Sequence, residues 1–394
     1  MEGPRDLEAS PTAAQSPDKS ATRFAFVDGL RGVAALCIVV FHAWWYEPEP
    51  KTMLESAHWC FDVLFLQTRR GVQILLVVSG FVIAYSLRNT WVTPREILLF
   101  VGRRAVRLAP AYWIAIGLAL LVDVMCRGPL KLPSPFQGQP SIPRVLAHLA
   151  FLQDVFDFES LSAGLWTVCI EMQFYVVAVL GWGLAQRLFV RPENHQPQAS
   201  SPAILVVFAT LAVISLAYWG RLESNDHWVT HFLWRFFLGM LTWWTLDRTV
   251  PAIVFNTVVA IAVAQLVYEL GFDPVFEWRL EWPSGNTVSL ATALALFVAG
   301  RKERLHVWLN WRWLQFVGRI SYSLYLVHFP VSHLVFSAGW RWFGQTPTSA
   351  QAAAIFLLSI VTSLVSAYAL YVLAEAPSVR WAAKMKYWFA IPNR

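Results

Sequence analysis

Long apolar segments recur along this chain and constrain its fold more than any other feature. A helix that crosses the hydrocarbon core of a bilayer needs about 20 predominantly apolar residues. Ten segments approach this length: 26–46, 71–88, 109–125, 166–185, 203–220, 228–246, 251–268, 284–300, 318–337 and 352–374. We therefore predict an all-α, polytopic membrane protein with about ten transmembrane helices.

The overall composition supports the membrane assignment. Hydrophobic residues make up 57% of the 394 residues and charged residues only 14%, with a mean hydropathy of +0.47. Such a chain cannot hide its apolar surface in one soluble core. The net charge is +6, but the basic residues fall between the apolar segments, where cytoplasmic loops collect them. We therefore set nucleic acid aside as a partner.

The distribution of Lys and Arg predicts that both termini are cytoplasmic. In this orientation the basic loops 88–108 and 301–319 lie inside, and the net acidic loop 269–283 lies outside, as the positive-inside rule requires. The apolar stretch 145–156 is too short to span and is followed by acidic residues. We predict that it forms an interfacial or re-entrant helix.

The two ends of the chain are expected to lie outside the membrane domain. Residues 1–23 are polar and lack the apolar core of a signal peptide, so they are predicted to form a disordered cytoplasmic tail. Residues 378–394 are predicted to form a short basic cytoplasmic tail, which leaves 24–377 as the membrane domain. The four cysteines show no metal-ligand spacing, and we expect no metal site and no permanently bound cofactor.

Several ionisable residues lie inside predicted spans, where such groups are costly and usually functional. At 1.5 Å per residue, His42, Glu171 and Arg235 lie roughly 6, 8 and 10 Å from the outer face. They are therefore candidates to converge in the outer half of the bundle. A structural network of paired buried charges is the alternative.

A second group of basic residues lies toward the cytoplasm. Arg31 is roughly 16 Å from His42 along the first helix, which suits an elongated ligand with an anionic end at the arginines and a reactive end at His42. Arg103, Arg104 and Arg107 follow in the next cytoplasmic loop, and their planar guanidinium groups match phosphate oxygens. Arginines at a cytoplasmic membrane edge are also ordinary topology determinants, so that alternative stays open.

Six short motifs occur in the order in which one membrane-protein family carries them. They are Arg31 and His42 separated by ten residues, Ser79-Gly80-Phe81, Arg103-Arg104 with Arg107, Pro110 and Tyr112, Leu165-Trp166-Thr167 with Glu171 and Tyr175, Gly318-Arg319-Ile320-Ser321-Tyr322-Ser323-Leu324-Tyr325-Leu326-Val327-His328, and Glu375-Ala376-Pro377. On these motifs the chain resembles the acyltransferase-3 family, integral-membrane acyltransferases that modify sugars and other acceptors. The similarity extends over about residues 24–377, although Val168 stands where the family usually has Leu.

The resemblance implies acyl transfer in a bacterial plasma membrane. A cytoplasmic acyl-coenzyme A, typically acetyl-coenzyme A, would donate the acyl group to a hydroxyl of a saccharide or glycolipid at the outer face. His42 would act as general base, Glu171 would orient it, and Arg235 would stabilise the oxyanion. The donor-binding residues would be Arg31, Arg103, Arg104, Arg107, Ser79, Tyr325 and His328.

Three points stay open in that scheme. Transfer is either direct or passes through an acyl-enzyme intermediate on His42 or Ser79. His328 either lines the donor channel or forms a hydrogen bond between helices. Asp154, in the 126–165 segment, and Trp166, directly after it, are the candidate acceptor contacts, but such a segment could equally only cap the bundle.

Two other function classes were weighed. A secondary transporter of a small anionic solute would also carry ionisable residues in its spans, but the sequence shows no clear two-half repeat and no matching pair of Gly/Pro-broken helices. A non-catalytic polysaccharide-assembly or sensor subunit has no need to keep Arg31, His42 and Glu171 in costly positions.

Overall fold

The computed structural model describes residues 24–45, 68–189, 201–222, 226–272, 281–344 and 347–388. This part of the chain is all-helical, and the predicted tail 1–23 lies outside it. The helices are α1 (Ala25–Trp45), α3 (Gly71–Leu87), α4 (Pro94–Arg127), α5 (Ile142–Leu149), α6 (Trp166–Phe189), α7 (Ser201–Ala217), α8 (Val229–Leu246), α9 (Ala252–Phe272), α10 (Glu281–Arg301), α11 (Arg312–Phe343), α12 (Ser349–Leu370) and α13 (Ala376–Trp388). A 3₁₀ turn (Trp219–Arg221) precedes α8, and a π-helical turn (Tyr371–Glu375) joins α12 to α13.

Each of the ten predicted apolar segments falls on one of these helices. Among the residues that the structure describes, four helical stretches are long and apolar enough to cross a membrane: Ala25–Trp44, Pro94–Arg127, Trp166–Leu188 and Ser349–Met385. Helices α3, α7 and α9 are apolar but shorter. Helices α8 and α11 carry more polar residues, and those are largely buried within the bundle, where neighbouring helices rather than lipid surround them.

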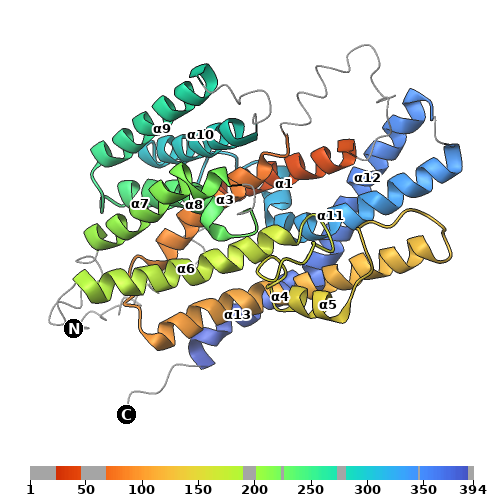
Figure 1. Ribbon diagram of the computed structural model, residues 1–394, viewed down its shortest axis with the longest axis horizontal. Coiled ribbons are helices and arrows are strands. Elements are labelled where there is room, and N and C mark those ends of the chain that lie inside the picture. Colours follow the sequence, from red (N-terminus) through yellow and green to blue (C-terminus); the bar gives the residue numbers. More distant parts are fainter. Residues whose placement is uncertain are drawn as a thin grey trace, which may run out of the picture.

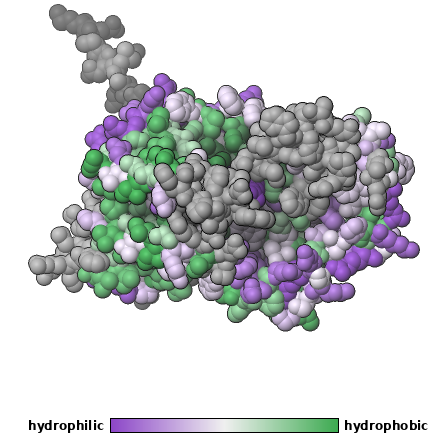
Figure 2. Space-filling view, turned by 45° about the horizontal axis from the view of Figure 1, so that its top comes forward, coloured by the Kyte–Doolittle hydropathy of each residue, from purple (hydrophilic) through white to green (hydrophobic). Residues whose placement is uncertain are grey.

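The helices pack as one bundle in which segments distant in sequence lie together. The most extensive contacts join α1 to α11, α3 to α8 and α11 to α12. In Figure 1, α9 and α10 lie along one edge of the bundle, and α4 with α13 lies along the opposite edge. The outward faces of α9 and α12 expose large apolar side chains, among them Ile261, Leu357 and Val365, and Figure 2 shows hydrophobic side chains over a broad area of the visible surface. Such faces suit contact with lipid.

Two glycines let α3 and α8 approach closely. A Cβ added at Gly80 would collide with the Phe236 carbonyl oxygen, and one added at Gly239 would collide with the Val77 carbonyl oxygen. Because the contact is reciprocal, a side chain at either position would force the two backbones apart. Packing therefore accounts for the glycine of the Ser79-Gly80-Phe81 motif.

A similar contact joins α1 to α11. A Cβ added at Gly318 would collide with the Asp28 carbonyl oxygen, and one at Gly32 would lie 2.9 Å from the Leu314 carbonyl oxygen. The first and fifth motifs of the sequence therefore lie side by side, although they come from opposite ends of the chain. This contact brings the polar residues of α1 next to those of α11.

Substituting Gly239 with valine is expected to destabilise the bundle by at least about 3 kcal/mol, because overpacking against a backbone that cannot yield is at the costly end of such changes. The midpoint of thermal unfolding in detergent measures this effect. Gly117→Ala on α4 is the matched control, because its added Cβ meets no atom within 4 Å and alanine favours a helix over glycine. Equal midpoints for Gly239→Val and the wild type would contradict the packing argument.

The structure differs from the sequence prediction at the start of α4. Residues 94–108 were expected in a loop but form the first half of the helix. The Thr93 side chain caps the helix by accepting a hydrogen bond from the Glu96 backbone N–H at 3.2 Å, and Pro94 occupies the first turn, a favourable start for a helix. The arginines of the predicted basic loop therefore stand on a helix at fixed spacing.

Two further segments refine the predicted organisation. The stretch 145–156 was expected as one helix, but α5 covers Ile142–Leu149 and is followed by turns. Ser141 caps it, and Phe151 has a left-handed φ of 59°, which is incompatible with continuing the helix. Most of the predicted tail 378–394 is α13, which packs against α4.

Candidate functional site

A pocket with an empty volume of about 890 Å³ lies inside the bundle and has charged and polar side chains in its walls. Its walls come from α1, α3, α4, α6, α8 and α11. Six of the predicted site residues line it: Arg31, Ser79, Arg104, Arg107, Glu171 and Tyr325. The structure thus brings together residues that the sequence placed at two different depths.

Glu171 is the centre of a hydrogen-bonded cluster in this pocket. The Ser79 hydroxyl donates to Glu171 Oε1 at 3.1 Å, and the Tyr175 hydroxyl donates to the same oxygen. The Arg104 guanidinium lies over the Tyr175 ring, 5.3 Å from its centroid. Tyr175 is one helical turn from Glu171 and therefore lies on the same face of α6. The cluster joins α3, α4 and α6 around one carboxylate.

A wider groove, with an empty volume of about 1750 Å³, adjoins the pocket. We call it the arginine groove; it is lined by the segment 86–91, the first half of α4 and α13, and its arginines include Arg95 and Arg103. Arg104 and Arg107 line both the groove and the pocket. They are three residues apart on α4 and share one face, so they stand between the two spaces.

A buried carboxylate lies behind these arginines. Glu375, in the π-helical turn, accepts hydrogen bonds from the Ser323 hydroxyl at 2.6 Å and the Ser323 backbone N–H at 3.2 Å. Its charge interacts electrostatically with those of Arg31 and Arg107. The Glu375-Ala376-Pro377 motif was part of the family resemblance, but Glu375 was assigned no role from the sequence. Its position in a π-helical turn is a signal, because such turns often occur at functional sites. Glu375 balances part of the positive charge next to the pocket.

Two histidines contact each other beyond Tyr325. His42 Nδ1 lies 2.9 Å from the Ile38 carbonyl oxygen and 3.1 Å from His328 Nε2. His328 Nδ1 lies 3.1 Å from the Leu324 carbonyl oxygen. The ring of Tyr325, which lines the pocket, is 5.8 Å from the His328 ring. The sequence prediction missed this histidine pair, His42 and His328, although both residues were candidates.

Other predicted neighbours are not joined in this way. The hydrogen bonds of Glu171 run to Ser79 and Tyr175 rather than to His42, so the orienting role of Glu171 stays a prediction. Arg235 is buried on α8, with its guanidinium 5.3 Å from the Phe232 ring centroid, and it does not line the pocket. Its oxyanion role also stays a prediction.

The two candidate acceptor residues differ in accessibility. Trp166 begins α6 and is half-buried, with its ring 5.9 Å from that of Phe232. Asp154 is only 6% exposed in the turns after α5. Burial raises the pKa of the Asp154 carboxyl to about 7, since desolvation disfavours the charged form. A buried carboxyl offers little surface to a saccharide, and the contact predicted for Asp154 stays a prediction.

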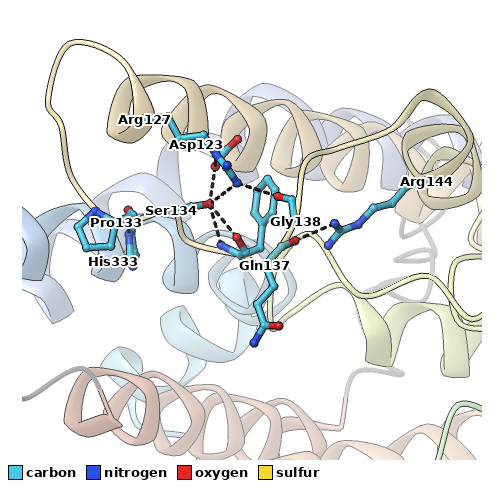
Figure 3. A network of polar contacts seen from close by, with 9 residues as sticks. Asp123, Arg127, Pro133, Ser134, Gln137, Gly138, Arg144 and His333 are labelled. Atoms are coloured by element: carbon cyan, nitrogen blue, oxygen red, sulfur yellow. Dashed lines mark hydrogen bonds and ion pairs between the residues drawn. The ribbon is translucent and has the colours of Figure 1, made fainter.

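The 128–141 loop is tied to the end of α4 by polar contacts (Figure 3). Arg127 donates to Asp123 and to the Gly138 carbonyl oxygen, both at 2.7 Å. The Ser134 hydroxyl donates to the same Asp123 carboxylate. Charge-assisted hydrogen bonds of this kind are strong, so the loop is held in a defined position.

The same loop is anchored to α5 and α11 as well. Arg144 donates to the Gln137 carbonyl oxygen and to the Glu159 carbonyl oxygen, each at 2.9 Å. His333 Nε2 donates to the Pro133 carbonyl oxygen at 2.8 Å (Figure 3). His333 follows His328 on α11 by roughly 7 Å of helix. The loop therefore packs on α11 just beyond the histidine pair, on the side away from the arginine groove.

Comparison of the sequence with known proteins finds a matching family and several relatives. A family model described as an acyltransferase domain matches residues 24–372. BcsY of Komagataeibacter xylinus, which carries the name of a membrane-bound transacylase, is 26% identical over 358 residues, or 89% of this chain and 81% of BcsY.

Two further relatives carry names that point to exopolysaccharide and O-acetylation. The exopolysaccharide production protein ExoZ of Rhizobium meliloti is 26% identical over 328 residues, or 79% of this chain and 89% of ExoZ. The O-acetyltransferase OatA of Staphylococcus aureus is 22% identical over 377 residues, or 89% of this chain and 56% of OatA. No solved structure matches the chain.

Proposed function

This chain belongs to the acyltransferase-3 family and is an integral-membrane acyltransferase, and from that premise we propose a specific reaction. It moves an acetyl group from cytoplasmic acetyl-coenzyme A to a hydroxyl of a saccharide or glycolipid at the opposite face of a bacterial plasma membrane. The names of ExoZ and OatA support a saccharide acceptor and an acetyl group. One observation carries the proposal: the arginine groove meets the pocket at Arg104 and Arg107, and Tyr325 in the pocket wall lies next to His328 of the histidine pair.

The basic end of this route suits the donor. Coenzyme A carries its phosphates at one end and its thioester at the other, joined by a narrow arm. Arg103, Arg104 and Arg107 line the groove, and guanidinium groups bind phosphate oxygens bidentately. The arm would pass Arg104 and Arg107 into the pocket, along Arg31 and Tyr325, toward the histidine pair. The structure thus offers a wide basic groove that leads into the pocket.

The histidine pair suits the chemistry of transfer. His42 would accept the proton of the acceptor hydroxyl as its oxygen attacks the thioester carbonyl carbon. The carbon–sulfur bond then breaks, and the coenzyme A thiolate takes the proton from His42. The 128–141 loop packs on α11 just beyond this pair. The acceptor would approach from this side, opposite the arginine groove that binds the donor.

The same arrangement supports a membrane orientation. We propose that the ten apolar helices span the bilayer with both termini in the cytoplasm. The arginine groove then faces the cytoplasm, where basic residues are enriched and acyl-coenzyme A is made. The 128–141 loop faces the other side, where a saccharide acceptor would be presented.

The test is transfer of radiolabelled acetyl in inside-out membrane vesicles, whose cytoplasmic face is exposed. Acetyl-coenzyme A labelled in the acetyl group is added outside, and extracts of the native host are enclosed inside the vesicles as a source of acceptor. We expect covalent label in a saccharide or lipid fraction only where the protein is present. Label that stays in free small molecules inside the vesicles would instead indicate a transporter, and no label despite abundant protein would overturn the proposal.

A further inference from the structure

We propose that His328 is a positioning residue that holds His42 in the tautomer with its proton on Nδ1, so that Nε2 is free to accept the proton of the acceptor hydroxyl. The inference rests on the proposed function, since it concerns the general base of that reaction. It gives His328 a task in the chemical step, where the sequence left it either lining the donor channel or packing between helices.

The tautomers of His328 and His42 follow from their neighbours, because some of these neighbours can only accept a hydrogen bond. A carbonyl oxygen has no proton to give. His328 Nδ1 lies 3.1 Å from the Leu324 carbonyl oxygen, so Nδ1 carries the proton of His328. In a neutral imidazole the other nitrogen is then an acceptor, and His328 Nε2 presents a lone pair.

His42 Nδ1 therefore faces two acceptors. One is the Ile38 carbonyl oxygen at 2.9 Å, and the other is His328 Nε2 at 3.1 Å. Only a protonated Nδ1 satisfies both, in a shared hydrogen bond. The lone pair of neutral His42 must then lie on Nε2, which is the protonation state that a general base needs.

The pair also favours the transition state. When the acceptor oxygen attacks the thioester carbon, its proton moves to His42 Nε2 and the ring becomes positively charged. The hydrogen bond from Nδ1 to His328 is then charge-assisted and stronger than in the ground state. His328 thus does for His42 what a carboxylate does in a catalytic triad, with a neutral acceptor in place of a charged one.

The surroundings of His328 suit a rigid support. Its side chain has no exposed surface, and its helix is locked to α1 by the close contact at Gly318. His42 is partly exposed on the same pair of helices. One histidine is therefore fixed within the core, and the other can reach a substrate.

The test compares His328→Leu with His328→Gln in the full chain. Leucine offers no acceptor, whereas the glutamine side-chain oxygen lies near the position of Nε2. We expect kcat to fall about tenfold or more in His328→Leu, the loss of one hydrogen bond that strengthens in the transition state, with the KM for acetyl-coenzyme A unchanged. His328→Gln should recover most of kcat. A rise in KM with kcat retained would show a donor-channel residue and overturn the inference, as would unchanged kinetics in both variants.

A second measurement does not depend on activity. The ¹⁵N spectrum of histidine-labelled protein reports which ring nitrogen of His42 carries the proton. We expect an unprotonated Nε2 in the wild type and in His328→Gln, and a mixture of tautomers in His328→Leu. A protonated Nε2 on neutral His42 in the wild type would overturn the inference even if acetyl transfer is confirmed. Absence of acetyl transfer in the wild type, by contrast, would count against the proposed function alone.

Discussion

Substituting His42 with alanine is expected to lower acetyl transfer by about 10²- to 10⁴-fold, the range that a positioned general base contributes. The loss should appear in kcat and equally in kcat/KM, because proton transfer belongs to the transition state and not to donor binding. Initial rates of label transfer at saturating acetyl-coenzyme A measure it. Both proteins must be equally abundant and must elute from a sizing column in detergent at the same volume.

His227→Ala is the matched control for this change. His227 lies between α7 and α8, with 48% of its side chain exposed, and it faces Asp226 and Asp157 rather than the pocket. Its loss should leave transfer unchanged. If His42→Ala kept more than about a tenth of the wild-type rate, general base catalysis by His42 would be excluded. The Ser79–Glu171 pair in the pocket would then be the next candidate for the chemistry.

The sequence was sufficient to predict the helices because lipid leaves few alternatives. A backbone in hydrocarbon must satisfy its hydrogen bonds internally, so apolar segments of this length become helices. The start of α4 was missed because its basic residues resemble a loop. The sequence does contain a helix start signal there: the capping residue Thr93, Pro94 at the first position and Glu96 three residues after the cap. This signal is better evidence for a helix than the nearby charges are for a loop.

The sequence predicted which residues belong to the candidate site, but not which of them contact one another. Helical rise gives the depth of a residue in the membrane, but neither which helices are neighbours nor which way each helix faces. His42 and Glu171 were matched by depth, yet the ring nitrogen beside His42 belongs to His328, 286 residues away. The contact at Gly318 decides that arrangement by bringing α1 against α11, and no local pattern in the sequence specifies it.

The sequence also did not predict which charged residues lie close together. Arg31, Arg104 and Arg107 were expected toward the cytoplasm, away from Glu171, and the structure brings all three into one pocket with it. Glu375 adds a second carboxylate close to Arg31 and Arg107. Opposite charges of this kind stabilise one another inside a protein. Which arginines lie near which glutamate is visible only in the folded bundle.

Removing both Arg104 and Arg107, which stand between the arginine groove and the pocket, should strongly weaken donor binding. Each charge-assisted hydrogen bond to a phosphate contributes about 1.5–3 kcal/mol, and about 1.4 kcal/mol corresponds to a tenfold change in affinity. We therefore expect Arg104→Ala with Arg107→Ala to raise the KM for acetyl-coenzyme A by more than about 100-fold. The change in kcat at saturating donor should be smaller, because neither residue contacts the histidine pair. Lysine at both positions should give an intermediate KM, since it keeps the charge but loses the planar fork.

Arg380→Ala separates this effect from a general loss of positive charge. Arg380 is exposed on α13, the helix that lines the groove, but does not line the groove itself, so its loss should leave KM within about twofold because exposed charges are screened. The dependence of KM on salt gives a second readout. It should be steep in the wild type and in Arg380→Ala and shallow in the double variant, because the phosphate contacts are the salt-sensitive part of binding. An unchanged KM in the double variant would mean that the donor phosphates bind outside the arginine groove, and the proposed route from groove to histidine pair would fall with it.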